Sequence, residues 1–241
     1  MNGSIAQQPF VLSPPGALVE RQGRVDLHLP ADAGPHPAVV LVHGAPLPPG
    51  TDDPRDWLLY RGYGALLAEQ GLVAAAISYQ VTDLAELPAT ADDIAGLVDL
   101  VRTDPRVDAD RVVLWFFSGG SLLAADWLRA APAWLRGIAL TYPLLVPLPG
   151  WDVDKRFLPI GALEAGTPTP VVLTRAGQDK IPQVLIGIAA FLDAADRAGR
   201  PVRLVEVPDG QHAFDILDHT AQSRAAVQAA RDAVVDLLRA D

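Results

Sequence analysis

The chain has 241 residues, a formal net charge of −10 and no cysteine. Without cysteine, the protein cannot form a disulfide scaffold, an iron–sulfur cluster, a cysteine–zinc site or a thiol nucleophile. The excess of acidic residues argues against nucleic-acid binding, and a hydrophobic content of 50% excludes a disordered chain. The length suits one α/β domain. We expect a single domain over residues 1–241, with an extended N-terminal segment at 1–16.

Short apolar runs alternate with amphipathic segments along nearly the whole chain. Runs rich in β-branched residues predict strands buried on both faces, and apolar stripes at helical spacing predict helices. In chain order, the expected elements are two outer strands within 17–29, strand 38–42, helix 56–70, strand 72–78, helix 91–102, strand 111–117, helix 119–130, strands 137–142 and 170–174, helix 182–198, strand 202–207 and helix 220–239. Asp92 and Asp93 would form the acidic first turn of their helix. This alternation predicts a mostly parallel sheet of about eight strands with helices on both faces.

Two proline-rich segments interrupt the alternation, at 45–55 and 143–169. The second is long enough to form a short lid over a pocket, and it can equally be an irregular surface connection. No signal peptide is recognisable at the N-terminus, and no run of about 18 apolar residues is present. We therefore expect a cytoplasmic protein that does not associate with membranes.

The most informative segment is a buried strand that runs directly into Ser118, Gly119 and Gly120, followed by a helix. A serine in such a sharp strand-to-helix turn is exposed at the end of the sheet, with the amide of the next residue close to whatever the serine attacks. A serine nucleophile also needs a base and a group that orients the base. Alternatively, Ser118 is only a helix N-cap, and Ser121 lies one turn into the helix, where a structural role is favoured.

Candidates for those two groups follow later strands. Asp179 comes just after strand 170–174, and His212 just after strand 202–207, so both should lie at the same edge of the sheet as Ser118. Asp209 is a rival for the carboxylate, but it would have to fold back within the loop of His212. Asp215 and Asp218 are expected near the start of the last helix.

Four motifs in this order resemble those of the α/β-hydrolases, of the small esterase and dienelactone-hydrolase-like type without a large cap domain. They are HGAP at 43–46, SGG at 118–120, AGQD at 176–179 and GQHAFD at 210–215, and the resemblance covers roughly residues 17–240. The resemblance implies that Ser118 is the nucleophile, His212 the base and Asp179 the orienting carboxylate. It implies an oxyanion hole formed by the amides of Gly119 and Ala45.

The sequence departs from the family in two respects. The motif G-x-S-x-G has Phe116 in place of its first glycine, so a large side chain must find room at the turn. Dienelactone hydrolases proper use a cysteine nucleophile, which this chain lacks. Aromatic residues near the active edge either line an apolar pocket or pack in the core. Those assigned to a substrate pocket are Phe116, Phe117, Tyr142, Trp151 and Phe157.

The predicted activity is hydrolysis of a small carboxylic ester through an acyl-enzyme intermediate. We expect no cofactor and no metal site, because the histidines lack ligand spacing. His43 is expected to support the oxyanion loop, and His28, His36 and His219 to lie at the surface. The expected partner is a small-molecule ester, and a homo-oligomer is possible. A thioesterase or acyltransferase would use the same triad, and a non-catalytic binding protein on this scaffold is the alternative from another class.

Overall fold

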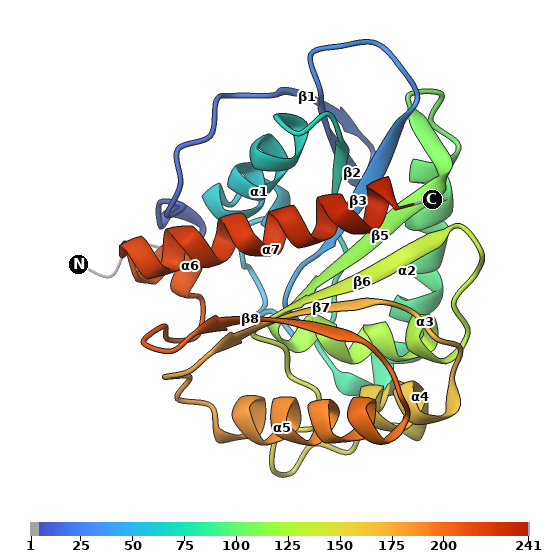
Figure 1. Ribbon diagram of the computed structural model, residues 1–241, viewed down its shortest axis with the longest axis vertical. Helices are drawn as coiled ribbons and strands as arrows, with labels where there is room; N and C mark the ends of the chain where they lie inside the picture. Colours follow the sequence, from blue (N-terminus) through green and yellow to red (C-terminus); the bar gives the residue numbers. More distant parts are fainter. Residues whose placement is uncertain (1–4, 241) are drawn as a thin grey trace.

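The computed structural model describes residues 5–240, and its centre is one eight-stranded sheet (Figure 1). The strand order across the sheet is β1-β2-β4-β3-β5-β6-β7-β8. The strands are β1 (Leu18–Gln22), β2 (Val25–Leu29), β3 (His36–Val42), β4 (Val73–Ile77), β5 (Val107–Phe117), β6 (Leu135–Thr141), β7 (Val171–Ala176) and β8 (Val202–Val207). Strand β2 pairs antiparallel with β1 and β4, and the other pairings are parallel. The predicted mostly parallel sheet is confirmed.

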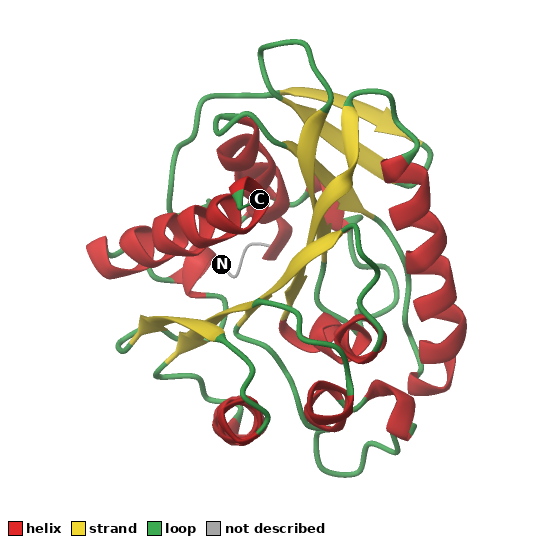
Figure 2. Cartoon of the chain, turned by 45° about the vertical axis from the view of Figure 1, so that its right-hand side comes forward, coloured by secondary structure: helices red, strands yellow, loops and turns green. Residues whose placement is uncertain are grey.

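Helices cover both faces of the sheet (Figure 2). One face carries α1, α6 and α7, and the other carries α2, α3, α4 and α5. The helices are α1 (Leu58–Ala68), α2 (Leu87–Arg102), α3 (Ala125–Arg129), α4 (Pro159–Ala165), α5 (Pro182–Arg197), α6 (Phe214–Leu217) and α7 (Ala221–Arg239). Short 3₁₀ helices are η1 (Ile5–Gln7), η2 (Pro54–Asp56), η3 (Leu84–Glu86), η4 (Ser118–Ala124) and η5 (Lys155–Phe157). Within residues 5–240, no helix is long and apolar enough to span a bilayer.

Strand β5 shows how the sequence builds two hydrophobic cores. Successive side chains of a strand point to opposite faces. Leu114 and Phe116 therefore join the core under α2 and α5, whereas Val113, Trp115 and Phe117 join the core under α1 and α7. All five are at most 1% exposed. Because both faces are covered, β5 is apolar throughout its second half, as expected for a central parallel strand.

Two predicted helices differ from the observed ones at their starts. Helix α2 begins at Leu87 rather than 91, because Asp83 and Glu86 form a capping box one turn earlier and Pro88 occupies the first turn. Asp92 therefore lies in the second turn. The predicted helix 119–130 is a 3₁₀ helix, η4, that continues into the short helix α3.

Segment 143–169, which was expected to be a loop or a short lid, contains η5 and α4. Phe157 and Leu163 are buried in the core, and α4 packs against α3 and α5. The guanidinium of Arg156 forms ion pairs with Asp92 and Asp126. The segment is thus anchored to the helical layer that it crosses.

The N-terminal segment is not simply extended, as had been expected for 1–16. Residues Ile5–Gln7 form a 3₁₀ turn, and Phe10 and Val11 are buried. The Phe10 ring packs where a Cβ atom at Gly62 of α1 would stand, 2.3 Å from the ring. Residues 1–4 lie outside the described residues.

His28 is buried in β2 instead of lying at the surface, and both ring nitrogens lack a hydrogen-bond partner. Burial lowers the pKa of His28 to about 4. The unfolded chain takes up this proton below about pH 6.5, whereas the folded protein takes it up only near pH 4. Protonation of His28 therefore does not reduce the free energy of unfolding above pH 6.5, and it reduces this free energy progressively as the pH falls from 6.5 toward 4.

Replacing His28 with leucine is expected to reduce the loss of stability between pH 7 and pH 5 by about 2 kcal/mol, because the unfolded state then has one proton fewer to bind. Urea unfolding at the two pH values measures this difference. The matched control is His219→Gln at an exposed position, which should retain the parent's pH dependence. An unchanged pH dependence in His28→Leu would contradict the assignment.

Candidate active site

Ser118 stands at the turn between β5 and η4, with a backbone φ of 49°. A positive φ is strained for a non-glycine residue and is typical of a serine in a strand-to-helix elbow. The next two residues must be glycines, because neighbouring backbone approaches them closely. A Cβ atom at Gly119 would lie 1.8 Å from the Ala45 carbonyl oxygen, and one at Gly120 would lie 2.1 Å from the His43 carbonyl oxygen.

Phe116 fits without disrupting this turn. Its side chain is fully buried in the core under α2 and α5, and its backbone pairs with Val42 and Leu140 on either side. The side chain therefore has room on that face of the sheet, among the helices that cover it. The elbow at Ser118 therefore tolerates a phenylalanine two residues earlier.

A continuous hydrogen-bonded chain connects three predicted site residues. Ser118 Oγ lies 2.8 Å from His212 Nε2, and His212 Nδ1 lies 2.6 Å from Asp179 Oδ2. The Asp179 side chain has no exposed surface, whereas the His212 side chain is 26% exposed. A carboxylate facing Nδ1 favours the tautomer that carries its proton there, which leaves Nε2 free to accept the serine proton.

Backbone contacts between two loops hold the imidazole and the carboxylate together. The amide of Gly177 donates to the Val207 carbonyl, and that of Gln178 donates to the Gly210 carbonyl, each at 2.8 Å. The second oxygen of Asp179 accepts the amide of Ile181 at 2.9 Å. Both Asp179 oxygens thus have a fixed partner, which sets the carboxylate's orientation.

The rival residues lie elsewhere. Asp209 accepts a hydrogen bond from the Gln222 side chain at 3.1 Å and belongs to the exposed surface. Ser121 is fully buried, and its hydroxyl has no partner. Asp218 lies near the start of the last helix, just before its N-cap residue, Thr220. Its carboxylate accepts hydrogen bonds from the backbone and side chain of Gln211, next to His212.

The loop after β3 faces Gly119. The amide of Gly44 donates to the Tyr60 hydroxyl at 3.3 Å, and the Ala45–Pro46 peptide bond is cis. The close approach of Ala45 to Gly119 brings the backbones of the two residues together beside Ser118. This arrangement is compatible with two amides that bind one oxygen atom.

The His43 side chain holds this loop in place through contacts with Tyr79 and Gly44. Its ring stacks on Tyr79 with centroids 3.9 Å apart, and its Nδ1 lies 2.8 Å from the Gly44 carbonyl oxygen. The Tyr79 hydroxyl donates to the His43 carbonyl at 2.5 Å. Burial lowers the pKa of His43 to about 4, so the ring is neutral at pH 7. A buried neutral ring held this way acts as a structural support.

No family model matches the chain, and no curated protein matches its sequence. Solved structures of esterase 2 from Thermogutta terrifontis are similar. The form phosphoramylated by tabun has a TM-score of 0.69 and 19% sequence identity, with 95% of this chain and 98% of that chain covered. The propionate-bound form has a TM-score of 0.69 and 21% identity, with coverages of 94% and 97%. This chain has the α/β-hydrolase fold.

Within this α/β-hydrolase fold, three aromatic residues predicted to line a pocket instead pack in the core. Phe116, Phe117 and Phe157 are at most 1% exposed. Phe117 contacts the rings of Tyr60 and Tyr63, and Phe157, the last residue of η5, is buried in the core under α2 and α5. The prediction was wrong for these three because their strand and helix positions turn them inward. Trp151 is partly exposed against the core under α2 and α5.

Tyr142 lies beside His212, in a network that sequence reasoning missed. Its ring centroid is 4.7 Å from that of His212, and its hydroxyl donates to Asp215. Asp215 belongs to α6 rather than to the start of the last helix, and it is fully buried. A carboxylate within the apolar run HAFDIL was the available signal, because a buried charge must find polar partners.

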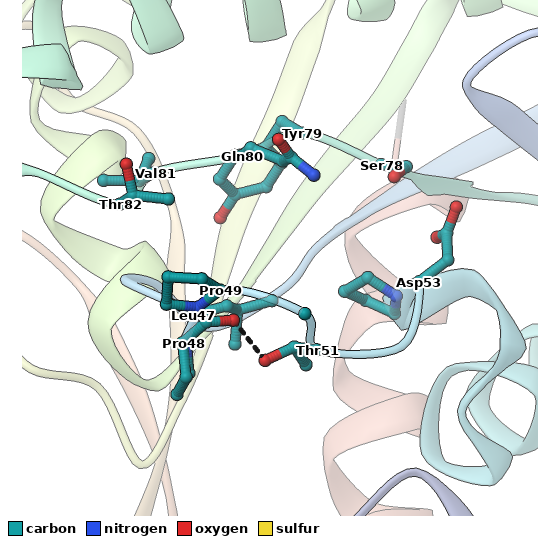
Figure 3. Close-up of a pocket in the computed structure, with 12 residues that line it drawn as sticks. Leu47, Pro48, Pro49, Thr51, Asp53, Ser78, Tyr79, Gln80, Val81 and Thr82 are labelled. Carbon is teal, nitrogen blue, oxygen red and sulfur yellow. Dashed lines mark hydrogen bonds between the residues drawn. The ribbon is translucent and has the colours of Figure 1, made fainter.

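A cavity of about 350 Å³ lies between the loop after β3 and the segment after β4 (Figure 3). Its walls are the loop after β3, over residues 47–54, and residues 78–82 after β4. Tyr79 lines the cavity and also stacks on His43. The cavity therefore shares a wall with the loop that approaches Gly119. Among residues 5–240, no three histidine or acidic side chains lie close enough together to hold a metal ion.

Proposed function

We propose that this protein is a serine hydrolase that cleaves small carboxylic esters. The observation that carries the proposal is the hydrogen-bonded chain Ser118–His212–Asp179, with links of 2.8 and 2.6 Å. These distances permit proton transfer from the serine hydroxyl to the imidazole as the serine attacks a carbonyl. Asp179 keeps the imidazole in the required tautomer and stabilises the imidazolium that forms.

The reaction proceeds in two halves. Ser118 Oγ forms a bond to the carbonyl carbon while its proton passes to His212 Nε2. The tetrahedral oxyanion collapses as the bond to the alcohol oxygen breaks, and His212 gives its proton to that oxygen. Water then attacks the acyl-enzyme and gives a proton to His212, and the second collapse releases the acid and restores the Ser118 hydroxyl.

The amides of Gly119 and Ala45 are assigned to the oxyanion. The proposal is supported by the close approach of the Ala45 backbone to Gly119, next to the nucleophile. Gly119 is also the first residue after Ser118 in η4, where amides lack helical partners and favour negative charge. Such donors typically lower the barrier by a few kcal/mol each.

The similar esterase gives further support and suggests a substrate class. Solved forms of Thermogutta terrifontis esterase 2 include one phosphorylated by paraoxon and others with propionate or butyrate bound. Carried to this chain, these suggest short acyl groups and an activated serine that an organophosphate modifies. No cofactor takes part in the proposed reaction.

The test measures hydrolysis of p-nitrophenyl butyrate and labelling by paraoxon. Ser118→Ala is expected to lower kcat by about 10⁴-fold or more and to abolish the diethylphosphoryl adduct, which mass spectrometry locates in the parent on the Ser118 peptide. The matched control is Ser121→Ala, which removes a buried hydroxyl without a partner and should retain activity.

The outcomes separate the alternatives. Hydrolysis of butyryl thioesters in clear preference to the oxygen ester would make the protein a thioesterase with the same triad. A folded parent that neither hydrolyses esters nor reacts with paraoxon would be a binding protein on this scaffold. Equal activity in Ser118→Ala and the parent would reject Ser118 as the nucleophile.

A further inference from the structure

A buried carboxylate and two tyrosines lie behind the histidine of the site. Asp215 has no exposed surface, and its Oδ2 accepts hydrogen bonds from the hydroxyls of Tyr63 and Tyr142, each at 3.0 Å. Its Oδ1 lies 3.1 Å from the Tyr142 hydroxyl. These residues come from α6, from α1 and from the end of β6, so tertiary packing alone brings them together.

Tyr142 connects this carboxylate to the imidazole. Its backbone φ is 35°, which is unusual for a bulky residue, and its amide donates to the Thr174 carbonyl at 2.9 Å. Its ring meets that of His212 at an interplanar angle of 53°, with centroids 4.7 Å apart. A strained residue persists only where its surroundings determine it, and strain of this kind concentrates at functional sites. Here the hydroxyl is held by Asp215 and the amide by β7.

The imidazole of His212 needs such a support. The ring is fixed by its bond to Cβ and by its hydrogen bonds to Ser118 and Asp179. Hydrogen bonds tolerate a range of angles, so these restraints still permit small tilts of the ring. Contact with the ring of Tyr142 restricts these tilts. A misorientation of a proton-transfer group lowers the rate of reaction more than it weakens substrate binding.

We propose that Tyr142, anchored by Asp215, is a positioning residue that fixes the tilt of the His212 imidazole. The inference rests on the proposed function, in which His212 exchanges protons with Ser118 and the substrate. Tyr142 does not touch the reacting atoms in this scheme and acts only through the ring of His212.

The ionisation states fit this role at neutral pH. Burial raises the pKa of Asp215 to about 6, and burial raises the pKa of both tyrosines well above their usual value. Among the titratable groups around Asp215, Tyr63 from α1 and Tyr142 from the end of β6 donate hydrogen bonds to it. His212 from the preceding loop and Tyr60 from α1 interact with it electrostatically. At pH 7.5 the Asp215 carboxylate is ionised and accepts a hydrogen bond from each tyrosine hydroxyl, and both tyrosines remain neutral.

The test compares Tyr142→Phe, which keeps the ring and loses its anchor, with Tyr63→Phe, which removes the other hydroxyl from the same carboxylate. At pH 7.5, Tyr142→Phe is expected to lower kcat for p-nitrophenyl butyrate about tenfold, with KM changed less than twofold. Tyr63→Phe should keep kcat within twofold of the parent, although it destabilises the fold in the same way. Both variants are assayed well below their unfolding temperatures.

A second measurement does not depend on catalysis. The proton between His212 Nδ1 and Asp179 is expected to exchange with water at least about fivefold faster in Tyr142→Phe and Asp215→Asn than in the parent or Tyr63→Phe, as seen by NMR. The proposal is overturned if Tyr142→Phe has the kcat and the His212 proton exchange rate of the parent. It is also overturned if Tyr142→Phe and Tyr63→Phe lose kcat equally. If the parent hydrolyses no ester, the proposed function fails, and the exchange rates still decide whether Tyr142 holds the imidazole.

Discussion

Replacing Asp179 with asparagine is expected to lower kcat for ester hydrolysis by about 10³- to 10⁴-fold, with little change in KM. One Asp179 oxygen accepts the amide of Ile181 at 2.9 Å, and the other faces His212 Nδ1 at 2.6 Å. In the variant, the amide oxygen keeps the bond to Ile181, so the NH₂ group faces His212. This donor stabilises the tautomer with its proton on Nε2, which cannot accept the proton of Ser118.

The control for this substitution is Asp209→Asn, which alters the rival carboxylate that precedes His212 in the same loop. Asp209 lies at the surface and contacts Gln222, so the variant should keep kcat within twofold of the parent. Steady-state kinetics and thermal unfolding of both variants are measured together. If folded Asp209→Asn loses more kcat than folded Asp179→Asn, then Asp209, and not Asp179, orients the His212 imidazole.

The residues of the hydrogen-bonded chain could be selected from the sequence because each follows a recognisable buried strand. Ser118, Asp179 and His212 come after β5, β7 and β8, and parallel strands end at one edge of a sheet. The local sequence pattern was therefore sufficient to predict that residues up to 94 positions apart in the chain lie at one site. The role of the two glycines after Ser118 could also be predicted, because only glycine fits where two backbone segments nearly touch.

The support behind the histidine could not be predicted in the same way. Tyr142 meets Asp215 and His212 only because β6, α6 and the loop after β8 pack together, and no local pattern encodes that contact. The buried position of Phe117 follows from strand alternation, but assigning it required knowing that both faces of β5 are covered. The start of α2 was missed because the capping residues lie before the apolar stripe that defined the helix.

The buried titratable groups act on stability in opposite directions. His28 and His43 have folded pKa values of about 4, so each destabilises the fold as the pH falls below 6.5. Asp215 has a folded pKa of about 6, above its unfolded value, so the fold binds this proton more tightly between pH 4 and pH 6. Its contribution is therefore lost as the pH rises through that interval. The carboxylate offsets part of the acid sensitivity that the two histidines cause.

Replacing Gly120 with alanine is expected to destabilise the fold by more than about 4 kcal/mol, and it would leave little folded protein. The added Cβ atom would stand 2.1 Å from the His43 carbonyl oxygen, and a backbone oxygen cannot turn aside as a flexible side chain can. That oxygen also accepts the Tyr79 hydroxyl, and the His43 ring is stacked on Tyr79. Relief of the clash must therefore move the elbow, the end of β3 or both.

The matched control is Gly96→Ala in α2, where an added Cβ atom meets nothing within 4 Å. In an exposed helix interior, alanine is favoured over glycine by up to about 1 kcal/mol, so this variant should be as stable as the parent or more so. Urea unfolding and the yield of folded protein are compared for both. A typical point mutation lowers the free energy of unfolding by about 1 kcal/mol. If Gly120→Ala lowers it by no more than about this amount, the elbow and the His43 loop separate readily. The close approach that supports Ala45 as an oxyanion donor would then lose its structural basis, because the same two backbone segments form both contacts.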